Sequence, residues 1–270
     1  MDDSPDRHTL ASDLFMELAS ELRCSILVSL SKKPAKLSSL ARELDTTVQD
    51  VHRNVSRLAE AGLVRRDDSL FQLTEYGRIV IKQISYFLFM KKHSRFFEDH
   101  TLGSLPEKFV QRIGALQNCE LVSSIAPVLE RLKKLESGAK RQLKIIVSQA
   151  WAEEGSILIE LSMHGVDVFS IVGRNTIFPK EIVESIIKTM GRLGVNEKMK
   201  VRMTEKVDVA LYIADNQAAA VMFSNMKGEV DMGALFIGSD PAFCEWCSDL
   251  FDYMWEHAEG RFDVKKTKIV

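Results

Sequence analysis

The sequence lacks the short motifs that mark nucleotide-binding enzymes and most metal proteins. Neither a Gly-x-Gly-x-x-Gly fingerprint nor a P-loop occurs in its 270 residues. The six histidines are scattered, without the His-x-His or His-Glu-x-x-His spacing of metal ligands. The sequence therefore predicts a protein with no metal site and no cofactor.

Cysteine is scarce as well. Four cysteines in a chain of this size do not make the disulfide framework of a small secreted protein. One Cys-x-x-Cys pair is present, Cys244 and Cys247, inside a predicted helix where Cys247, Leu250, Phe251 and Met254 repeat at helical spacing. This repeat favours two core cysteines, and a redox pair or half of a metal site is the alternative.

Long apolar runs are missing too. A membrane-spanning helix needs about 18 uninterrupted apolar residues, and the nearest candidate, residues 79–90, is broken by Lys82 and Gln83. The N-terminal segment MDDSPDRH is acidic and has no apolar stretch, so it does not resemble a signal peptide. With 46% hydrophobic and 27% charged residues, the chain has the composition of an ordinary soluble protein and is predicted to be cytoplasmic.

Charge is unevenly distributed along the chain. The net charge is −2, but residues 20–95 contain fourteen Lys/Arg and eight Asp/Glu, a local charge of +6. The remaining residues then carry −8. A basic module joined to an acidic body is the pattern expected when contact with nucleic acid is confined to one end of a protein.

The basic region contains the most informative stretch of the sequence, residues 37–73. A short helix with Ser38 as its N-cap is followed by a polar break at residues 45–47. A second helix is predicted from Val48 to Ala61, because Val48, Val51, Val55 and Leu58 form one apolar stripe.

The second helix is followed by the signals of a β-hairpin. Gly62 stands where a helix C-cap favours a residue that can adopt a left-handed conformation. Residues 63–66 and 70–73 read as two short strands joined by a polar turn at residues 67–69. Helix, turn, helix and hairpin make a winged helix-turn-helix, whose second helix lies in the major groove of double-stranded DNA.

The polar face of the second helix supplies the candidate DNA-binding residues. Arginine can form paired hydrogen bonds with guanine, and glutamine with adenine. The wing tip is acidic and would repel phosphate, so the arginines at the base of the wing are the better backbone contacts. The alternative is an ordinary solvated helix face. The candidates are Thr47, Gln49, Asp50, His52, Arg53, Ser56, Arg57, Arg65 and Arg66.

Helices are predicted on both sides of this stretch. Residues 9–19 and 20–31 form two amphipathic helices, the first marked by Leu10, Leu14, Phe15 and Leu18. After the wing, a long helix from residue 74 to about 97 is apolar on more than one face and so must bury more than one face. We expect one face to meet the same helix of a second copy in a homodimer, and the alternative is packing against its own C-terminal domain.

The second half of the chain alternates between strands and helices. Helices are expected at residues 107–116, 124–135, 151–164, 179–193 and 240–257, with strands at 143–148, 166–172, 199–203, 207–214, 217–224 and 233–238. This order predicts a mixed, partly parallel sheet. Trp151, Arg174 and Asn175 follow strands at their carboxyl ends, where open α/β sheets bind ligands, and are candidate effector-binding residues. The alternative is an ordinary strand-to-helix loop.

Three segments together resemble a known family. RNVSRLAEAGLVRR, FFEDHTLGSLPEKFVQRIGALQNCELV and DLFDYMWEHA are similar to archaeal winged-helix transcriptional regulators with a methanogenesis-regulator middle domain. The resemblance covers roughly residues 10–258. It implies a cytoplasmic archaeal regulator whose C-terminal domain senses an unknown effector or mediates assembly.

The α/β half is also similar in strand order to one repeat of a phospholipase-D-like domain, as in related sugar-responsive archaeal regulators. Enzymes of that class need a His-x-Lys-x4-Asp motif, with the histidine as nucleophile. The matching segment here, residues 224–231, has Asn225 at the histidine position, and an amide cannot form a phosphohistidine. We therefore predict no enzymatic activity, and a degenerate phosphodiesterase or a protein-interaction module remain the alternatives.

The predicted fold class is thus mixed α/β, with four segments. Residues 9–97 form the winged helix-turn-helix domain with its long dimerisation helix, and residues 98–142 form a helical linker region. Residues 143–258 form the α/β effector-sensing or assembly domain, and residues 259–270 a mobile tail.

Overall fold

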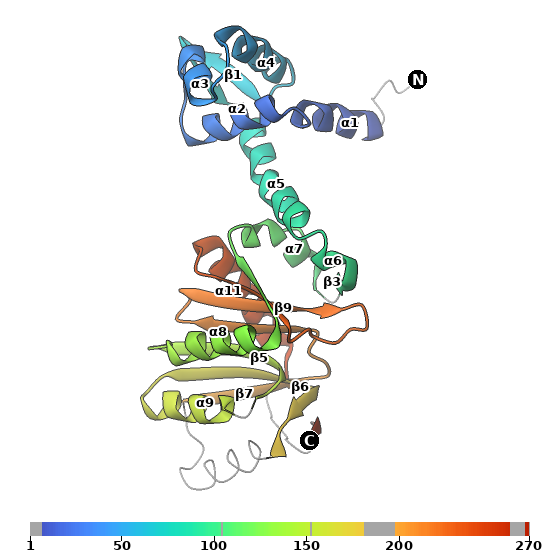
Figure 1. Cartoon of the computed structure of the whole chain (residues 1–270), viewed down its shortest axis with the longest axis vertical. Helices are drawn as coiled ribbons and strands as arrows, with labels where there is room; N and C mark the ends of the chain where they lie inside the picture. The colour runs from blue at the N-terminus through green and yellow to red at the C-terminus, as the bar shows by residue number, and fades with distance from the viewer. Residues whose placement is uncertain (1–6, 104, 152, 181–197, 260–267, 270) are drawn as a thin grey trace. The chain divides into compact units, whose positions relative to one another are not determined.

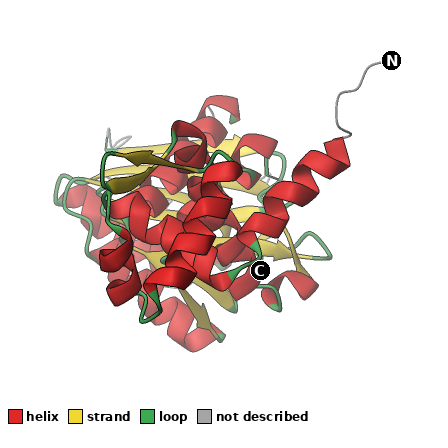
Figure 2. Cartoon of the chain, turned by 90° about the horizontal axis from the view of Figure 1, so that it is seen from above, coloured by secondary structure: helices red, strands yellow, loops and turns green. Residues whose placement is uncertain are grey.

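The computed structural model describes residues 7–103, 105–151, 153–180, 198–259 and 268–269. The chain divides into two compact units, Met1–Phe87 and Leu88–Val270, each described here by itself (Figure 1). Helices and strands both contribute, as the mixed α/β prediction requires (Figure 2). Among the described residues, no helix has the length and apolar character needed to cross a membrane.

The first unit has the element order of a winged helix-turn-helix. Its elements are α1 (Arg7–Leu18), α2 (Glu21–Lys32), α3 (Leu37–Glu43), α4 (Val48–Glu60), β1 (Val64–Asp67), β2 (Leu70–Leu73) and the first part of α5 (Glu75–Lys92). The hairpin strands β1 and β2 pair antiparallel to form the wing. The predicted order of helix, turn, helix and hairpin is confirmed.

Local chemistry sets the ends of the α3–α4 pair. Asp45 adopts a positive φ of 47° in the break, and Gly62 a φ of 73° after α4, as the C-cap prediction requires. The prediction of Ser38 as N-cap is wrong, because α3 begins at Leu37 and its N-cap is Lys36. The reason is a pair of backbone hydrogen bonds between Ala35 and Phe71, which holds the chain against the wing just before the helix.

The apolar stripe of α4 is buried over most of its length. Val51, Val55 and Leu58 are at most 1% exposed and pack on α2, α3 and the wing. Val48, predicted as part of the stripe, is instead 49% exposed. It is the first residue of the helix and lies beyond the reach of that core.

Only part of the apolar pattern of α1 is buried. Leu14 and Leu18 pack against the core of the first unit. Leu10 and Phe15, predicted for the same buried face, are 55% and 54% exposed, and so is Met16 at 60%. One flank of α1 therefore leaves large apolar side chains in solvent.

The wing is fastened to the start of α5. Thr74 donates a hydrogen bond from its hydroxyl to the carbonyl of Gly62 (2.6 Å) and accepts one from the amide of Gly77 (3.0 Å), so it caps the helix that was predicted to start at this residue. A Cβ on Gly77 would lie 2.0 Å from the carbonyl oxygen of Leu63. Only glycine allows this close approach of α5 to the backbone that enters the wing.

Helix α5 ends at Lys92 rather than near residue 97. A turn follows, and α6 (Phe96–Asp99) brings Phe96 and Phe97 into an aromatic cluster with Phe223 and Phe236 of the second unit. This packing, which local periodicity does not reveal, explains the earlier end.

The second unit is built on a sheet of nine strands among the described residues. Its order is β11-β6-β5-β8-β9-β10-β4, with β3 paired to β9 and β7 paired to β6. The strands are β3 (His100–Thr101), β4 (Glu120–Ser123), β5 (Gln142–Gln149), β6 (Asp167–Phe178), β7 (Met199–Thr204), β8 (Val209–Ala214), β9 (Ala218–Asn225), β10 (Ala234–Gly238) and β11 (Lys268–Ile269).

Parallel and antiparallel pairing divide this sheet. β5, β6, β7 and β11 pair parallel, whereas β5–β8, β8–β9, β9–β10 and β10–β4 are antiparallel, as the alternating pattern and then the hairpin pattern predict. Asp215 and Asn216 take φ values of 55° and 57° in the β8–β9 turn, which confirms the predicted hairpin.

Helices cover both faces of the sheet. α8 (Ile125–Ser137) and α9 (Glu154–Met163) lie together on one face, over a core that includes Leu143, Ile145 and Tyr212 (Figure 1). The alternate residue Lys144 points to the other face, where it pairs with Asp252 of α11 (Pro241–His257) at 2.7 Å. The remaining short elements are α7 (Glu107–Val110) and the 3-10 helix η1 (Ile113–Leu116).

Three expectations about this half are corrected. Residues 98–142 are not purely helical, because β4 pairs with β10 in the main sheet. The helix predicted at 107–116 is split into α7 and η1. Strand β6 continues to Phe178, since Thr176 donates a hydrogen bond to the carbonyl of Val147 (2.7 Å) and keeps the strand beside β5. From residue 181 on, the helix predicted at 179–193 lies outside the described residues.

Two glutamates meet in the core between α8 and α9. Glu136 and Glu154 are 0% and 2% exposed, and among the described residues neither oxygen of Glu136 and only one oxygen of Glu154 can have a hydrogen-bond partner. Burial raises the pKa of both side chains, and that of Glu154 rises from an ordinary 4.5 to about 8. The pair therefore holds a proton near neutral pH that the unfolded chain does not hold.

This proton predicts a stability that depends on pH. Between about 4.5 and about 8 the folded chain binds more protons than the unfolded chain, so the free energy of unfolding falls as pH rises through this window, by about 1.4 kcal/mol per pKa unit of difference. Glu154→Gln should flatten this slope and stabilise the second unit at pH 8, measured by urea unfolding followed through tryptophan fluorescence. Glu153→Gln, at the exposed neighbouring position, should keep the wild-type slope. A slope unchanged by Glu154→Gln would contradict a shared buried proton.

Candidate nucleic-acid interface

The exposed face of α4 carries most of the predicted DNA-binding side chains. Gln49, His52 and Arg53 are exposed, and Ser56 is half-buried beside them. The Arg53 side chain is 75% exposed and lies 3.1 Å from the carboxylate of Asp50. Since an exposed pair of this kind contributes at most about 1 kcal/mol, Arg53 can leave it at little cost.

Thr47 and Asp50, also predicted to contact DNA, form the N-terminal cap of α4. The amide of Asp50 donates to Oγ1 of Thr47 (3.0 Å), and the Thr47 hydroxyl donates to the Asp50 carboxylate (2.7 Å). Both side chains thus have a structural role in starting the helix.

The two wing arginines are exposed, as predicted. Arg66 donates a hydrogen bond from Nε to the carbonyl of Asp68 (2.7 Å), at the turn where Asp68 has a φ of 50°. Arg65 lies beside it on β1 with an exposed side chain. The acidic turn that follows projects Asp67 and Asp68 into solvent.

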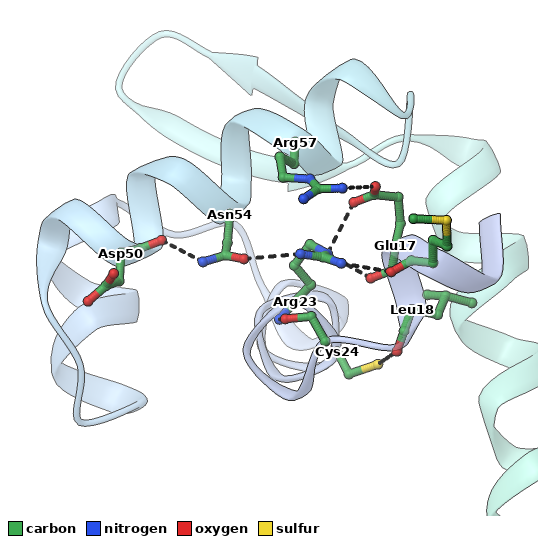
Figure 3. Close-up of polar contacts among 9 residues, drawn as sticks. Glu17, Leu18, Arg23, Cys24, Asp50, Asn54 and Arg57 are labelled. Atoms are coloured by element: carbon green, nitrogen blue, oxygen red, sulfur yellow. Dashed lines mark hydrogen bonds and ion pairs between the residues drawn. The ribbon is translucent and has the colours of Figure 1, made fainter. Parts of the chain in front are cut away.

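Arg57 differs from the other candidates because it belongs to an ion-pair network (Figure 3). Its guanidinium lies 2.6 Å from Oε1 of Glu17 on α1, and the other oxygen of Glu17 lies 3.1 Å from Nε of Arg23 on α2. Glu17 is only 15% exposed, whereas Arg57 is 49% exposed. One carboxylate therefore joins α1, α2 and α4.

Arg23 also completes the C-terminus of α1. Its guanidinium donates to the carbonyls of Met16 (2.7 Å) and Glu17 (2.8 Å), and the thiol of Cys24 donates to the carbonyl of Leu18 (2.8 Å). The last carbonyls of a helix have no partner within the helix, and a cation there is favoured. Two neighbouring side chains of α2 thus supply the missing donors.

Asn54 extends this network along α4. It is 8% exposed, donates to the carbonyl of Asp50 (2.8 Å) and accepts from Arg23 (3.5 Å). Neither Asn54 nor Arg23 nor Glu17 was predicted from the sequence to have a role. The available signal was a polar residue at 54, between Val51 and Leu58 on the apolar side of α4.

The cysteines outside the first unit are buried. Burial raises the pKa of Cys119 to about 11 and that of Cys247 well above its ordinary value. Cys244 is 3% exposed and its pKa is raised by the same cause. Thiols in this state are poor nucleophiles, which agrees with the core interpretation of the Cys244–Cys247 pair. No group of three or more potential metal ligands occurs in the described part of the chain.

The predicted effector-binding residues all have partners within the second unit. Arg174 pairs with Glu205 and Glu259, and lies inside β6 rather than in a loop after a strand. The side-chain amide of Asn175 donates a hydrogen bond to the carbonyl of Val207 and accepts one from its backbone N–H. Trp151 packs near Tyr212, with ring centroids 6.1 Å apart, and none of the described contacts joins it to Arg174 or Asn175.

Asn225, at the position where a phospholipase-D-like enzyme needs histidine, stabilises a turn. Its side-chain oxygen accepts hydrogen bonds from the amides of Lys227 (2.9 Å) and Glu229 (3.2 Å). Asp231 accepts from the amide of Gly233 and from His100. These contacts hold the β9–β10 connection.

Comparison with known families matches both units. Residues 12–93 match the HVO_A0261 N-terminal domain, and residues 126–257 match the middle domain of the methanogenesis regulatory protein FilR1. The two matches together support an archaeal regulator with a FilR1 middle domain, which confirms the resemblance found in the sequence.

The individual proteins that the chain matches are distant relatives. The methanogenesis regulatory protein FilR1 of Methanothrix harundinacea (strain 6Ac) is 21% identical over 253 residues, which are 87% of this chain and 55% of that protein. The chain thus spans about half the length of that relative. Among solved structures, the archaeal chromatin protein TrmBL2 aligns with 95% of this chain and all of its own (12% identity, TM-score 0.42). Nuc of Salmonella typhimurium, a phospholipase D family member, aligns with 54% of this chain and 99% of its own (13% identity, TM-score 0.40).

From this network we predict that Glu17 stabilises the packing of α4 against α1 and α2. Glu17→Ala leaves the buried guanidinium of Arg23 without its carboxylate, and we expect a loss of roughly 1–3 kcal/mol in the first unit. Native-state hydrogen exchange of the α4 amides should accelerate accordingly. Asp13→Ala, an exposed acidic position on the same helix, is the matched control and should leave exchange unchanged. Equal exchange in the two variants would show that the carboxylate does not support α4.

Proposed function

We propose that this protein is a sequence-specific DNA-binding transcriptional regulator that reads the major groove with α4. The observation that carries the proposal is the exposed row Gln49, His52 and Arg53 on the second helix of a winged helix-turn-helix. The two family matches support the same function. A helix of this kind fits the major groove, where base edges present a distinct pattern for each base pair.

The side chains divide by chemistry into base and backbone contacts. Arg53 and Gln49 can form paired hydrogen bonds with guanine and adenine, and His52 and Ser56 can add single ones. Arg65 and Arg66 are suited to phosphates beside the groove, with Thr47 and Asp50 holding the start of the helix. The affinity should then fall steeply with salt.

Arg57 would contact DNA only by exchanging partners. Its guanidinium already lies 2.6 Å from Glu17, so a DNA phosphate must compete with that carboxylate. We therefore assign Arg57 a positioning role in the free protein and a phosphate contact in the complex.

We further propose that the regulator acts as a homodimer. The large apolar side chains exposed on α5 include Ile79 (55%) and Phe87 (49%), and Phe15 of α1 lies edge-on to Phe87 at 6.1 Å. Covering such side chains with a second copy would remove them from water. A dimer would also offer two reading helices to successive major grooves, which lie about 34–36 Å apart on one side of the DNA.

The second unit completes the proposal as a domain that senses an effector or mediates assembly. Asn225 cannot replace a nucleophilic histidine, so we propose no enzymatic role. The presence of the FilR1 middle domain behind a DNA-binding unit supports regulation through this second unit. The chain covers only 55% of its curated relative, so its partners and targets are proposed from its own residues.

Substitution of the two α4 arginines should distinguish a residue that contacts DNA bases from one that holds α4 in place. Arg53→Ala should weaken binding to a selected operator by roughly 1–3 kcal/mol with unchanged thermal stability, because its side chain is 75% exposed. Arg57→Ala should weaken binding and also lower stability, by less than about 1 kcal/mol, since it loses Glu17. Fluorescence anisotropy at matched salt and thermal melts measure the two effects.

Arg78→Ala is the control for charge alone. Arg78 is exposed on α5 and pairs with Glu75 there, outside the reading face. Its removal should leave specific binding nearly unchanged. If Arg53→Ala and Arg78→Ala bind the operator equally well, α4 is not the reading helix.

The dimer proposal predicts a change of mass. Ile79→Asp and Phe87→Asp should each shift the protein toward monomer in sedimentation-velocity experiments, because a charge would be buried in the interface. Met226→Asp, at a 70% exposed apolar position in the second unit, should not. A wild-type protein that sediments as a monomer at all concentrations would refute the dimer.

A further inference from the structure

A pocket of about 390 Å³ opens at one edge of the sheet in the second unit. It lies between the last turns of α8, the β8–β9 hairpin and the end of β10. This edge is at the amino end of β5, whereas Trp151 follows its carboxyl end. The pocket is therefore separate from the effector residues expected from the sequence.

The floor of the pocket is apolar. Leu135 of α8, Ala214 and Ala218 of the hairpin and Ile237 of β10 contribute to its lining. The two alanines leave room where larger side chains would fill the space over the sheet. A ligand body of a few carbon atoms could rest there and be shielded from water.

The charged groups around the floor are not equivalent. Arg131 lies 3.2 Å from Glu120, so these two side chains balance each other. The carboxylate of Asp215 accepts three backbone hydrogen bonds, from the amides of Lys140, Arg141 and Gln142 at 2.8–2.9 Å. These groups are already used within the protein.

Lys134 is different. It lines the pocket, and no hydrogen bond or ion pair joins its ammonium group to another residue in the described part of the chain. The neighbouring Lys133, by contrast, pairs with Glu153 of the α8–α9 connection. Gln217 and Ser239 at the rim add exposed polar groups. Of the two basic residues that line the pocket, Lys134 is thus the one without an ion pair in the described part of the chain.

We propose that this pocket binds a small organic monocarboxylate, with its carboxylate on Lys134 and its apolar body over Ala214, Ala218 and Leu135. A phosphate ester is disfavoured, because a dianion would be repelled by Glu120, by Asp215 and by the C-terminal end of the α8 dipole. A monoanion with a hydrocarbon body matches one lysine and an apolar floor. The ligand would be the effector of the proposed regulator, and its role as effector rests on that proposal.

The test uses the whole 270-residue chain without DNA, so that its outcome is independent of operator binding. 4-Methylpentanoate is titrated by isothermal calorimetry, with 4-methylpentanamide as the uncharged analogue of the same shape. We expect saturable binding of the acid and much weaker binding of the amide. Lys134→Met should lower the affinity for the acid by about tenfold or more, the usual effect of losing a charge-assisted hydrogen bond.

Two further variants control for structure. Lys133→Met removes a charge from the adjacent position of the same helix and should bind the acid as the wild type does. Ala218→Leu should abolish binding by filling the floor while Lys134 remains, and thermal melts verify that each variant is folded.

Three results would overturn the proposal. They are no saturable binding of the acid, equal affinities for acid and amide, and equal effects of the Lys133 and Lys134 substitutions. If the acid binds as expected but leaves operator affinity unchanged, the site stands and its role as effector site is rejected. Loss of operator binding in the Arg53 variant tests the regulator itself and does not bear on this pocket.

Discussion

The first unit depends on one buried guanidinium. The guanidinium of Arg23 donates hydrogen bonds to the carbonyls at the end of α1 and to the side chain of Asn54 on α4, and it forms an ion pair with one oxygen of Glu17. A cation with five donors in a fixed plane can join three helices in this way, whereas a lysine could not. The exposed row on α4 is held at a defined angle because the helix behind it is tied through polar contacts as well as through Val51, Val55 and Leu58.

The second unit is stabilised mainly by apolar packing on its sheet. Its sheet combines parallel strands joined through helices with antiparallel hairpins, so both faces are covered and the core is apolar. Among the described residues, a few polar groups enter this core. The hydroxyl of Tyr212 is buried without a hydrogen-bond partner, Glu136 lies against Glu154, and Thr176 donates a hydrogen bond to the carbonyl of Val147. Asp215 acts in the same manner at the edge, where it accepts three amides at once. Lys134 of α8, which lines the pocket at this edge, has no such partner among the described residues.

Much of this architecture could be predicted, because periodicity and turn chemistry are local. The α3–α4 pair, the wing, the Asp215–Asn216 hairpin and the parallel-then-antiparallel order all follow from residues close together in the sequence. The errors concern contacts between distant residues. Phe96 and Phe97 end α5 early because of Phe223 and Phe236, and Thr176 extends β6 because of Val147. The role of Glu17 was likewise hidden, since its partners lie 6 and 40 positions away.

The close approach at Gly77 has an evolutionary meaning. A methyl group there would overlap the Leu63 carbonyl, so every other amino acid would force the long helix away from the strand that leads into the wing. Most surface positions of α5 can accept other side chains without such a clash, but position 77 requires glycine for this close approach. Glycine at 77, together with the Thr74 hydroxyl that accepts a hydrogen bond from its amide, is therefore what a relative with the same close approach is expected to share.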